Sequence, residues 1–239
     1  MEWSAKSATT AYLDTLKLCN DHKKDHDPCE TQEPESNEFI SALAAGMSAK
    51  LIVEVTSGVS SSTIALAAAA RQTGGRLVCI LPETTLAESK QVIKDSGLKD
   101  MVEFSTEDPI DALPNFENID FSLVDCKTDN YTRLLRLLDV NPKSSVVVAN
   151  NLVGEGKGLG GHVRGMKDRV AVRSLKRPIG KGMEITVIGK SDKLEKRNWV
   201  GHSRAERKGE AVKTGKSKWV VKIDEESGEE HIFRLPKHF

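Results

Sequence analysis

The chain has 239 residues, with 35 acidic and 35 basic side chains, and 38% of its residues are hydrophobic. This length and apolar share are typical of one α/β core with tails. No run of about 18 apolar residues occurs, so we expect no membrane-spanning segment and no membrane partner. Residues 1–10 lack the pattern of a secretory signal. Four scattered cysteines do not make a disulfide framework, which indicates a reducing compartment, the cytosol or the nucleus.

The charges are unevenly distributed along the chain. Residues 164–218 carry 17 lysines and arginines against six acidic residues, so this segment has a net charge of +11 and the rest has −11. A basic segment of this kind binds nucleic acid or an acidic surface, or it is a solvated linker. Composition alone leaves both interpretations open.

The first 46 residues predict two helices and a linker. Apolar residues at helical spacing predict a short amphipathic helix over residues 4–18. Residues 20–36 are polar, contain two prolines and predict a linker. Cys19, His22, His26 and Cys29 are potential zinc ligands there, but their spacing matches no common zinc motif. A second helix is expected from residue 38 to Gly46.

A β-α-β unit follows between residues 51 and 83. An apolar strand is predicted over 51–56, a small-residue loop over 57–61, and an alanine-rich helix that ends at Gly74 and Gly75. A second apolar run starts at Arg76. In a parallel crossover the loop lies at the carboxyl end of the first strand, where a helix N-terminus offers N–H groups to a ligand. We therefore expect a binding site at this loop.

The same alternation continues to residue 149 and then breaks. Strands near residues 101, 120 and 145 alternate with helices over 86–96 and 131–138, which predicts a doubly wound, mostly parallel sheet. Two strand-like runs, residues 170–176 and 183–188, predict a β-hairpin that adds an antiparallel strand to this sheet. Residues 190–216 predict a linker, and residues 218–235 a terminal hairpin.

Four stretches carry a resemblance to a known superfamily: residues 38–43, 54–66, 124–131 and 178–183. With the element order, they resemble the class I S-adenosylmethionine-dependent methyltransferases, and most closely the branch of the caffeoyl-coenzyme-A O-methyltransferases. A plant family of methyltransferase-like proteins of unknown function has a very similar layout, and the chain is identified as a member of it. The resemblance implies a Rossmann-like, three-layer α/β/α domain with seven strands over 37–190. We assign the other parts as an N-terminal helix (1–19), a linker (20–36), a basic linker (191–216) and a terminal hairpin (217–239).

The resemblance also implies a cofactor, S-adenosylmethionine. The residues that it places near the cofactor are Glu54, Thr56, Gly58, Ser60, Glu83 and Asp125. Two features depart from the pattern of active relatives. Thr56 and Ser60 stand where those relatives have glycines, and Leu81 stands where they have a carboxylate for the ribose. Glu83, two residues further on, replaces that carboxylate only if the strand ends in a bulge.

The metal site of the resembled branch is altered as well. Those relatives hold a divalent cation with an aspartate at the Asp125 position and an Asp-Asn pair after the fifth strand, where this chain has Asn150 and Asn151. Because an amide oxygen is uncharged, Asp125, Asn150 and Asn151 are weak ligands, and we expect no metal.

Three residues are candidates for catalysis. By resemblance, Lys127 and Asp125 lie near the methyl acceptor, and His162 follows a glycine-rich segment, residues 154–161, that predicts a mobile lid. Lys127 acts as a base only if burial favours its neutral form; the alternative is a solvated surface lysine.

Two functions from different classes remain open. The first is an O-methyltransferase that acts on a small hydroxylated molecule. The second is a catalytically degenerate methyltransferase fold that binds a protein or nucleic acid, through residues 164–218 and the terminal hairpin. A homodimer is compatible with both.

Overall fold

The computed structural model describes residues 3–25, 35–127, 130–152, 158, 170–177, 179, 181–190, 218–223 and 230–235. The chain divides into two compact units, Met1–Asn198 and Trp199–Phe239. The helices and strands of the first unit are α1 (Ala5–Asp25), α2 (Glu35–Gly46), β1 (Leu51–Val55), α3 (Ser61–Thr73), β2 (Arg76–Ile80), α4 (Glu83–Asp95), η1 (Lys99–Met101), β3 (Val102–Ser105), α5 (Pro109–Ala112), η2 (Leu113–Asn115), β4 (Phe121–Asp125), α6 (Tyr131–Leu137), β5 (Ser144–Asn150), β6 (Val170–Arg177) and β7 (Met183–Lys190). The second unit contributes β8 (Lys218–Ile223) and β9 (Glu230–Leu235).

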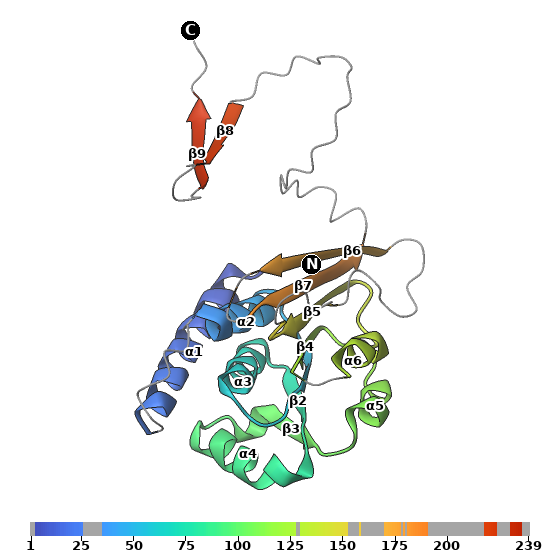
Figure 1. Cartoon of the computed structure of the whole chain (residues 1–239). Helices are drawn as coiled ribbons and strands as arrows, with labels where there is room; N and C mark the ends of the chain where they lie inside the picture. Colours follow the sequence, from blue (N-terminus) through green and yellow to red (C-terminus); the bar gives the residue numbers. More distant parts are fainter. Residues whose placement is uncertain are drawn as a thin grey trace. The chain divides into compact units, whose positions relative to one another are not determined.

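The seven strands of the first unit form one sheet in the order β3-β2-β1-β4-β5-β7-β6. Strands β1 to β5 are parallel, and β7 runs antiparallel to both β5 and β6. The predicted fold class, a doubly wound sheet closed by an antiparallel hairpin, is therefore confirmed (Figure 1). The strand order reverses between β1 and β4, because the chain moves outward from β1 to β3 and then returns to the other side.

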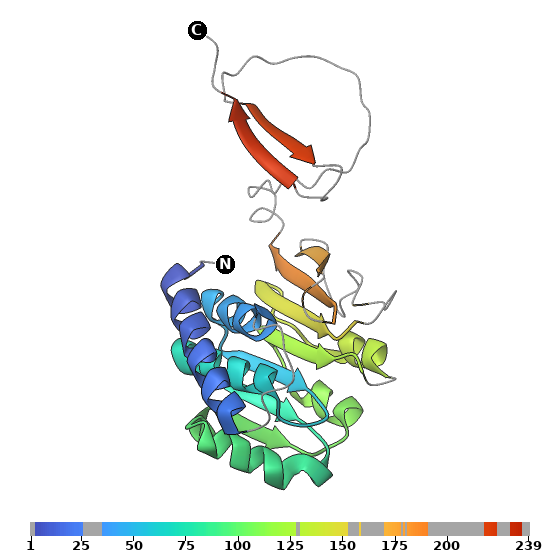
Figure 2. The same ribbon diagram turned by 60° about the vertical axis from the view of Figure 1, so that its left-hand side comes forward.

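Each face of this sheet is covered by its own set of helices. Ile52 and Val53 are neighbours in β1 and both are buried, but they belong to different hydrophobic clusters because successive strand residues point to opposite faces. The cluster around Ile52 includes residues of α1, α2, α3 and α4, and the cluster around Val53 includes residues of α5 and α6. Figures 1 and 2 show these two helical layers on either side of the sheet.

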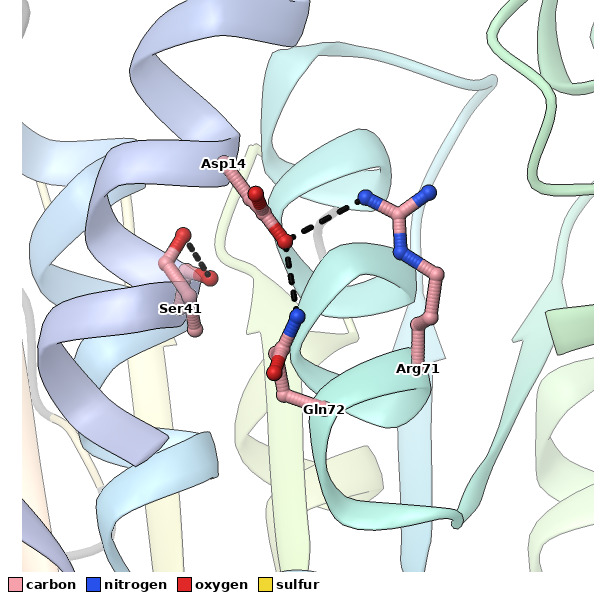
Figure 3. Close-up of polar contacts among 5 residues, drawn as sticks. Asp14, Ser41, Arg71 and Gln72 are labelled. Carbon is pink, nitrogen blue, oxygen red and sulfur yellow. Dashed lines mark hydrogen bonds and ion pairs between the residues drawn. The ribbon is translucent and has the colours of Figure 1, made fainter. Parts of the chain in front are cut away.

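Helix α3 is the centre of the first layer. Its alanines at positions 67–70 are fully buried, and α3 contacts both α1 and α2. Polar contacts hold α1 in place: Asp14 accepts hydrogen bonds from Arg71 Nη2 at 3.3 Å and Gln72 Nε2 at 2.8 Å, both on α3 (Figure 3). Ser41 of α2 donates its hydroxyl to the Ala11 carbonyl of α1 at 3.3 Å. The first helix is thus part of the packed domain.

Several boundaries differ from the sequence-based expectation. Helix α1 continues to Asp25, so the prediction of a linker from residue 20 was wrong for residues 20–25. The turns already packed on α2 and α3 nucleate the helix, and extending it by polar residues costs little. The predicted terminal hairpin is confirmed as β8 and β9. Among the helices that the structure describes, none is long and apolar enough to cross a membrane.

Candidate functional site

The candidate site lies where the carboxyl ends of β1 and β4 meet. These strands are parallel neighbours, with Glu54 beside Leu123 and Val55 beside Val124, so the side chains that end the two strands share one edge of the sheet. The strand order reverses at this pair, which is where open α/β sheets bind ligands. Glu54 near the end of β1 and Asp125 at the end of β4 place two carboxyl groups there.

Glu54 is enclosed by its neighbours. Its exposed fraction is 0%, and its carboxyl group accepts hydrogen bonds from Ser62 Oγ at 2.8 Å and from Cys79 Sγ at 3.8 Å. Burial raises the pKa of Glu54 to about 7, the hydrogen bonds from Ser62, Thr63 and Cys79 oppose that rise, and the charge of Asp125 adds to it. Near neutral pH this carboxyl group exists in both protonation states.

Burial has a similar effect on the thiol beside it. Cys79 pairs with Glu54 across β1 and β2, and it is fully buried. Burial and then the negative charge of Glu54 raise the pKa of the Cys79 thiol far above its usual range, which makes this cysteine a neutral hydrogen-bond donor. It supports Glu54 rather than acting as a nucleophile.

The loop after β1 is closed by hydrogen bonds of its own. Thr56 Oγ1 donates to the Gly58 carbonyl at 2.9 Å, and Val59 N–H donates to Ser89 Oγ of α4 at 3.4 Å. Thr85 of α4 donates to the Ser57 carbonyl at 3.2 Å. Gly58 is absent from the residues with positive φ in the described part of the chain. Thus Thr56 holds the loop against itself, and the contacts of Val59 and Ser57 hold it against α4.

Ser60 caps the helix that follows this loop. It is the N-cap of α3, its side chain accepts from Ser62 N–H, and the Thr63 side chain accepts from Ser60 N–H at 3.2 Å, which completes a capping box. These contacts use hydrogen-bonding groups that a ligand at a helix N-terminus otherwise binds. A ligand must therefore compete with the cap.

The position expected to recognise a ribose is apolar. Leu81 is only 2% exposed, and its N–H donates to the Ser105 carbonyl at 3.0 Å. Strand β2 ends at Ile80, and Glu83 is the exposed first residue of α4, so the structure has no strand bulge at this point that brings Glu83 into the place of Leu81. Without a bulge at the end of β2, Glu83 does not take the place of the carboxylate that was expected to bind the ribose.

At the β4 end Asp125 is also buried, at 9% exposed, but the chain reaches the surface two residues later, at Lys127. Asp125 Oδ1 accepts from Asn151 Nδ2 at 2.9 Å and from Lys127 N–H at 3.1 Å, and Asn150 is its register partner on β5. Asn151 holds a positive φ of 58°, which asparagine tolerates better than most residues. The structure thus brings Asp125, Asn150 and Asn151 together, as the resemblance implies.

The candidate base on this side is exposed. The Lys127 side chain lies at the surface, so it lacks the burial that favours a neutral lysine. His162 and nearly all of the glycine-rich segment lie outside the described residues. Within the described ranges, no group of three or more His, Cys, Asp or Glu residues is arranged to hold a metal ion.

Sequence reasoning missed another buried carboxyl group near the end of β5, that of Glu184, the register partner of Ala149. Glu184 of β7 is 3% exposed, and a Cβ added at Gly158 would clash with its carboxyl group. Burial and then the charges of Asp125 and Glu184 raise the pKa of the Cys126 thiol to about 12. The signal in the sequence was a single acidic residue in an otherwise apolar strand pattern.

The family model for proteins of unknown function called DUF1442 matches residues 1–235. The chain belongs to this family. No curated protein matches the chain.

Solved structures show where the fold belongs. A methyltransferase from Geobacter sulfurreducens is 20% identical, with a TM-score of 0.54 over 74% of this chain and 89% of that one. An O-methyltransferase from Bacillus cereus, solved with S-adenosylhomocysteine, is 21% identical, with a TM-score of 0.52 over 79% and 98%. A putative caffeoyl-CoA O-methyltransferase from Staphylococcus aureus is 14% identical, with a TM-score of 0.52 over 74% and 100%. These likenesses confirm the methyltransferase fold.

Proposed function

We propose that this chain is an S-adenosylmethionine-dependent methyltransferase-like protein that binds the cofactor at the adjoining ends of β1 and β4. Its proposed acceptor is a small hydroxylated molecule. The observation that carries the proposal is the pair Glu54 and Asp125, whose carboxyl groups lie near the carboxyl ends of two adjacent strands, where the strand order reverses. A pair of acidic groups in a buried setting suits a ligand that carries positive charge.

The residues at the candidate site suit one half of the cofactor better than the other. The cationic methionine half, with its sulfonium and ammonium groups, suits the carboxyl groups of Glu54 and Asp125. The ribose half meets a buried apolar residue, Leu81, and a loop that Thr56 closes. When bound, the cofactor supplies an electrophilic methyl group. Asp125 and Lys127 then lie beside the acceptor in this proposal, where one of them orients the hydroxyl group that receives the methyl.

Calorimetric titration with S-adenosylmethionine and S-adenosylhomocysteine tests the proposal. We expect a dissociation constant on the order of micromolar for the wild type and roughly tenfold weaker binding for Glu54→Gln, which removes the negative charge but keeps the side-chain shape. Glu117→Gln is the control, because Glu117 is exposed and precedes β4 at the opposite edge of the sheet. A folded protein that releases no heat with either ligand contradicts the proposal.

A second candidate is a catalytically degenerate domain that binds a protein or nucleic acid. The closed loop at Thr56 and the apolar Leu81 favour it, and so does the net charge of +11 over residues 164–218. Fluorescence anisotropy with a labelled RNA, at several salt concentrations, tests the nucleic-acid branch. Binding that is unchanged when residues 191–239 are removed excludes a role for that part of the basic segment and for the hairpin. The cytosolic or nuclear location remains a prediction.

A further inference from the structure

A chain of hydroxyl groups connects Glu54 with the surface. Glu54 is 0% exposed, so bulk water does not reach its carboxyl group directly. Ser62 Oγ donates to Glu54 Oε1 at 2.8 Å, and Ser62 Oγ and Ser60 Oγ lie 2.9 Å apart. Ser60 is the exposed N-cap of α3. Two short hydrogen bonds thus lead from the enclosed carboxyl group to a side chain that meets solvent.

This chain of hydrogen bonds suits both protonation states of the carboxyl group. A hydroxyl group both donates and accepts, and its hydrogen rotates to suit its partners. When Glu54 is ionised, Ser62 donates to it. When Glu54 is protonated, its own O–H donates to Ser62 Oγ, and Ser62 turns its hydrogen towards Ser60. The contact between the two serines allows either oxygen to donate.

The other groups around Glu54 do not reach the surface. Cys79 Sγ donates to Glu54 Oε2 at 3.8 Å, but Cys79 is 0% exposed, so this route ends inside the protein. Thr63 is also 0% exposed, and its hydroxyl accepts from the Ser60 N–H at 3.2 Å, a backbone group that does not pass a proton on. Among the contacts in the described part of the chain, the two serines alone lead from Glu54 to solvent.

Glu54 exchanges its proton near neutral pH. Burial disfavours its charge, the hydrogen bonds from α3 and β2 favour it, and the charge of Asp125 on β4 disfavours it; together they raise the pKa of Glu54 to about 7. Cys79 on β2 stays a neutral thiol and adds no charge. A cation near this carboxyl group favours the ionised form, so its binding releases a proton. Without a path, that proton leaves only when the fold opens.

We propose that Ser62 and Ser60 form a proton path between Glu54 and solvent. On the way out, the O–H bond of Glu54 breaks as Ser62 Oγ takes the proton, Ser62 gives its own hydrogen to Ser60 Oγ, and Ser60 gives its hydrogen to water. Each serine oxygen gains one hydrogen and loses one, and the products are a carboxylate and a hydronium ion. The path lets Glu54 change its charge while the fold stays closed, and it does not depend on the proposed methyltransferase activity.

Infrared spectroscopy of the full chain measures this exchange. A protonated carboxyl group gives a C=O stretching band that a carboxylate lacks, and deuterium shifts that band. At pH 6 we expect such a band in the wild type, and its loss in Glu54→Gln identifies it. After rapid mixing with deuterium oxide, the band should shift roughly tenfold or more slowly in Ser62→Ala than in the wild type, because the proton then leaves only through opening of the fold.

Amide hydrogen exchange of β1 in the same samples reports the opening of the fold. The band should shift faster than the amides exchange in the wild type and at the same rate in Ser62→Ala, so a loss of stability in the variant does not imitate the result. Ser60→Ala, which removes the second step, should also slow the shift.

Ser89→Ala is the control, because Ser89 is a buried serine beside the same loop that accepts from Val59 N–H and lies outside the path. Its band should shift as fast as that of the wild type. A shift in Ser62→Ala that is as fast as in the wild type overturns the proposal. A wild type without the band at pH 6 overturns it too, since Glu54 then holds no proton to release.

Discussion

The ends of β1 and β4 are neighbours in the sheet, but Glu54 is fully enclosed at 0% exposed, whereas Asp125 is 9% exposed and is followed by exposed residues. At β1, Glu54 is fully buried, and Ser62 and Cys79 donate to its carboxyl group. At β4, Asp125 lies beside Asn151 and the exposed Lys127. The cause is local: Glu54 precedes the last residue of its strand and lies under the start of α3, whereas Asp125 is the last residue of its strand.

This difference shows that an acidic residue at the expected position does not by itself mean that a ligand can reach it. A ligand that reaches Glu54 must displace contacts that the loop makes with α4 and within the α3 cap, and each lost hydrogen bond leaves a polar group to be satisfied again. A ligand at Asp125 meets a carboxyl group that is buried, at 9% exposed, but lies two residues from the exposed Lys127. We therefore expect substitutions at the β1 end to lower the stability of the fold. We expect a ligand to bind and dissociate more readily at the β4 end.

The largest expected effect concerns the backbone that supports the β4 and β5 side. Gly182 has a φ of 94°, and a Cβ there would clash with the Leu152 carbonyl. We expect Gly182→Ala to lower the free energy of unfolding by about 3 kcal/mol, measured by urea denaturation. Gly97→Ala is the matched control: its φ is 66°, but no atom lies within 4 Å of the added Cβ, so a loss of about 1 kcal/mol is expected. Equal losses would contradict the clash.

The next prediction tests the burial of Glu54 by measuring stability as a function of pH. The folded pKa of Glu54, about 7, lies above the ordinary value of 4.5, so between these two pH values the folded state binds more protons than the unfolded state. The stability that Glu54 contributes is then fully present below about pH 4.5 and is lost as the pH rises through 7. We expect this carboxyl group to account for a fall of about 3 kcal/mol between pH 4.5 and pH 8.

A variant with a neutral side chain of the same shape, Glu54→Gln, isolates the contribution of this carboxyl group to the pH dependence. Glu54→Gln should be nearly as stable as the wild type at pH 5 and more stable at pH 8, when both are unfolded in urea at a series of pH values. The slope between pH 5 and 7 should be flatter in the variant. Parallel pH profiles would mean that Glu54 is not the group that titrates.

A smaller effect tests the cap that competes with a ligand. Ser60→Ala removes the side chain that accepts from Ser62 N–H, and we expect a loss of about 1 kcal/mol in the free energy of unfolding. Ser57→Ala is the control, because Ser57 is exposed in the same loop, and its change should stay within about 0.5 kcal/mol. If Ser60→Ala is as neutral as the control, the cap contributes little and leaves the helix N-terminus open to a ligand.

Much of the fold was predictable because the strands are apolar and separated by clear stop signals. Residues 51–55 and 144–150 become buried strands as expected, and Gly74 ends α3 in the left-handed conformation. The extent of α1 was not predictable, because residues 20–25 have no apolar periodicity and continue a helix that tertiary contacts hold in place.

For the candidate site, the sequence indicated which strand ends meet but not how enclosed they are. The β-α-β pattern placed Glu54 near the carboxyl end of the first strand, but the contacts that enclose this region come from Ser89 of α4 and Cys79 of β2, and no local pattern reveals them. Glu184 was missed because β7 enters this region antiparallel, and the sequence does not state which strands it lies between. The roles of Lys127 and Asp125 in catalysis stay predictions.

The smallest expected effect on stability concerns Gly58. Its substitution tests whether the loop after β1 binds the cofactor, separately from whether the loop folds. A Cβ added at Gly58 would lie 3.7 Å from Thr85 Cβ, an ordinary van der Waals distance. We expect Gly58→Ala to change the free energy of unfolding by less than about 0.5 kcal/mol, because no strained backbone requires glycine there. If the cofactor approaches this backbone, the same variant binds S-adenosylmethionine several times more weakly in calorimetry, since the methyl group occupies the surface of closest approach. Unchanged affinity would place ligand contact at the β4 end alone, and a large loss of stability would show that the loop has no room beside Thr85.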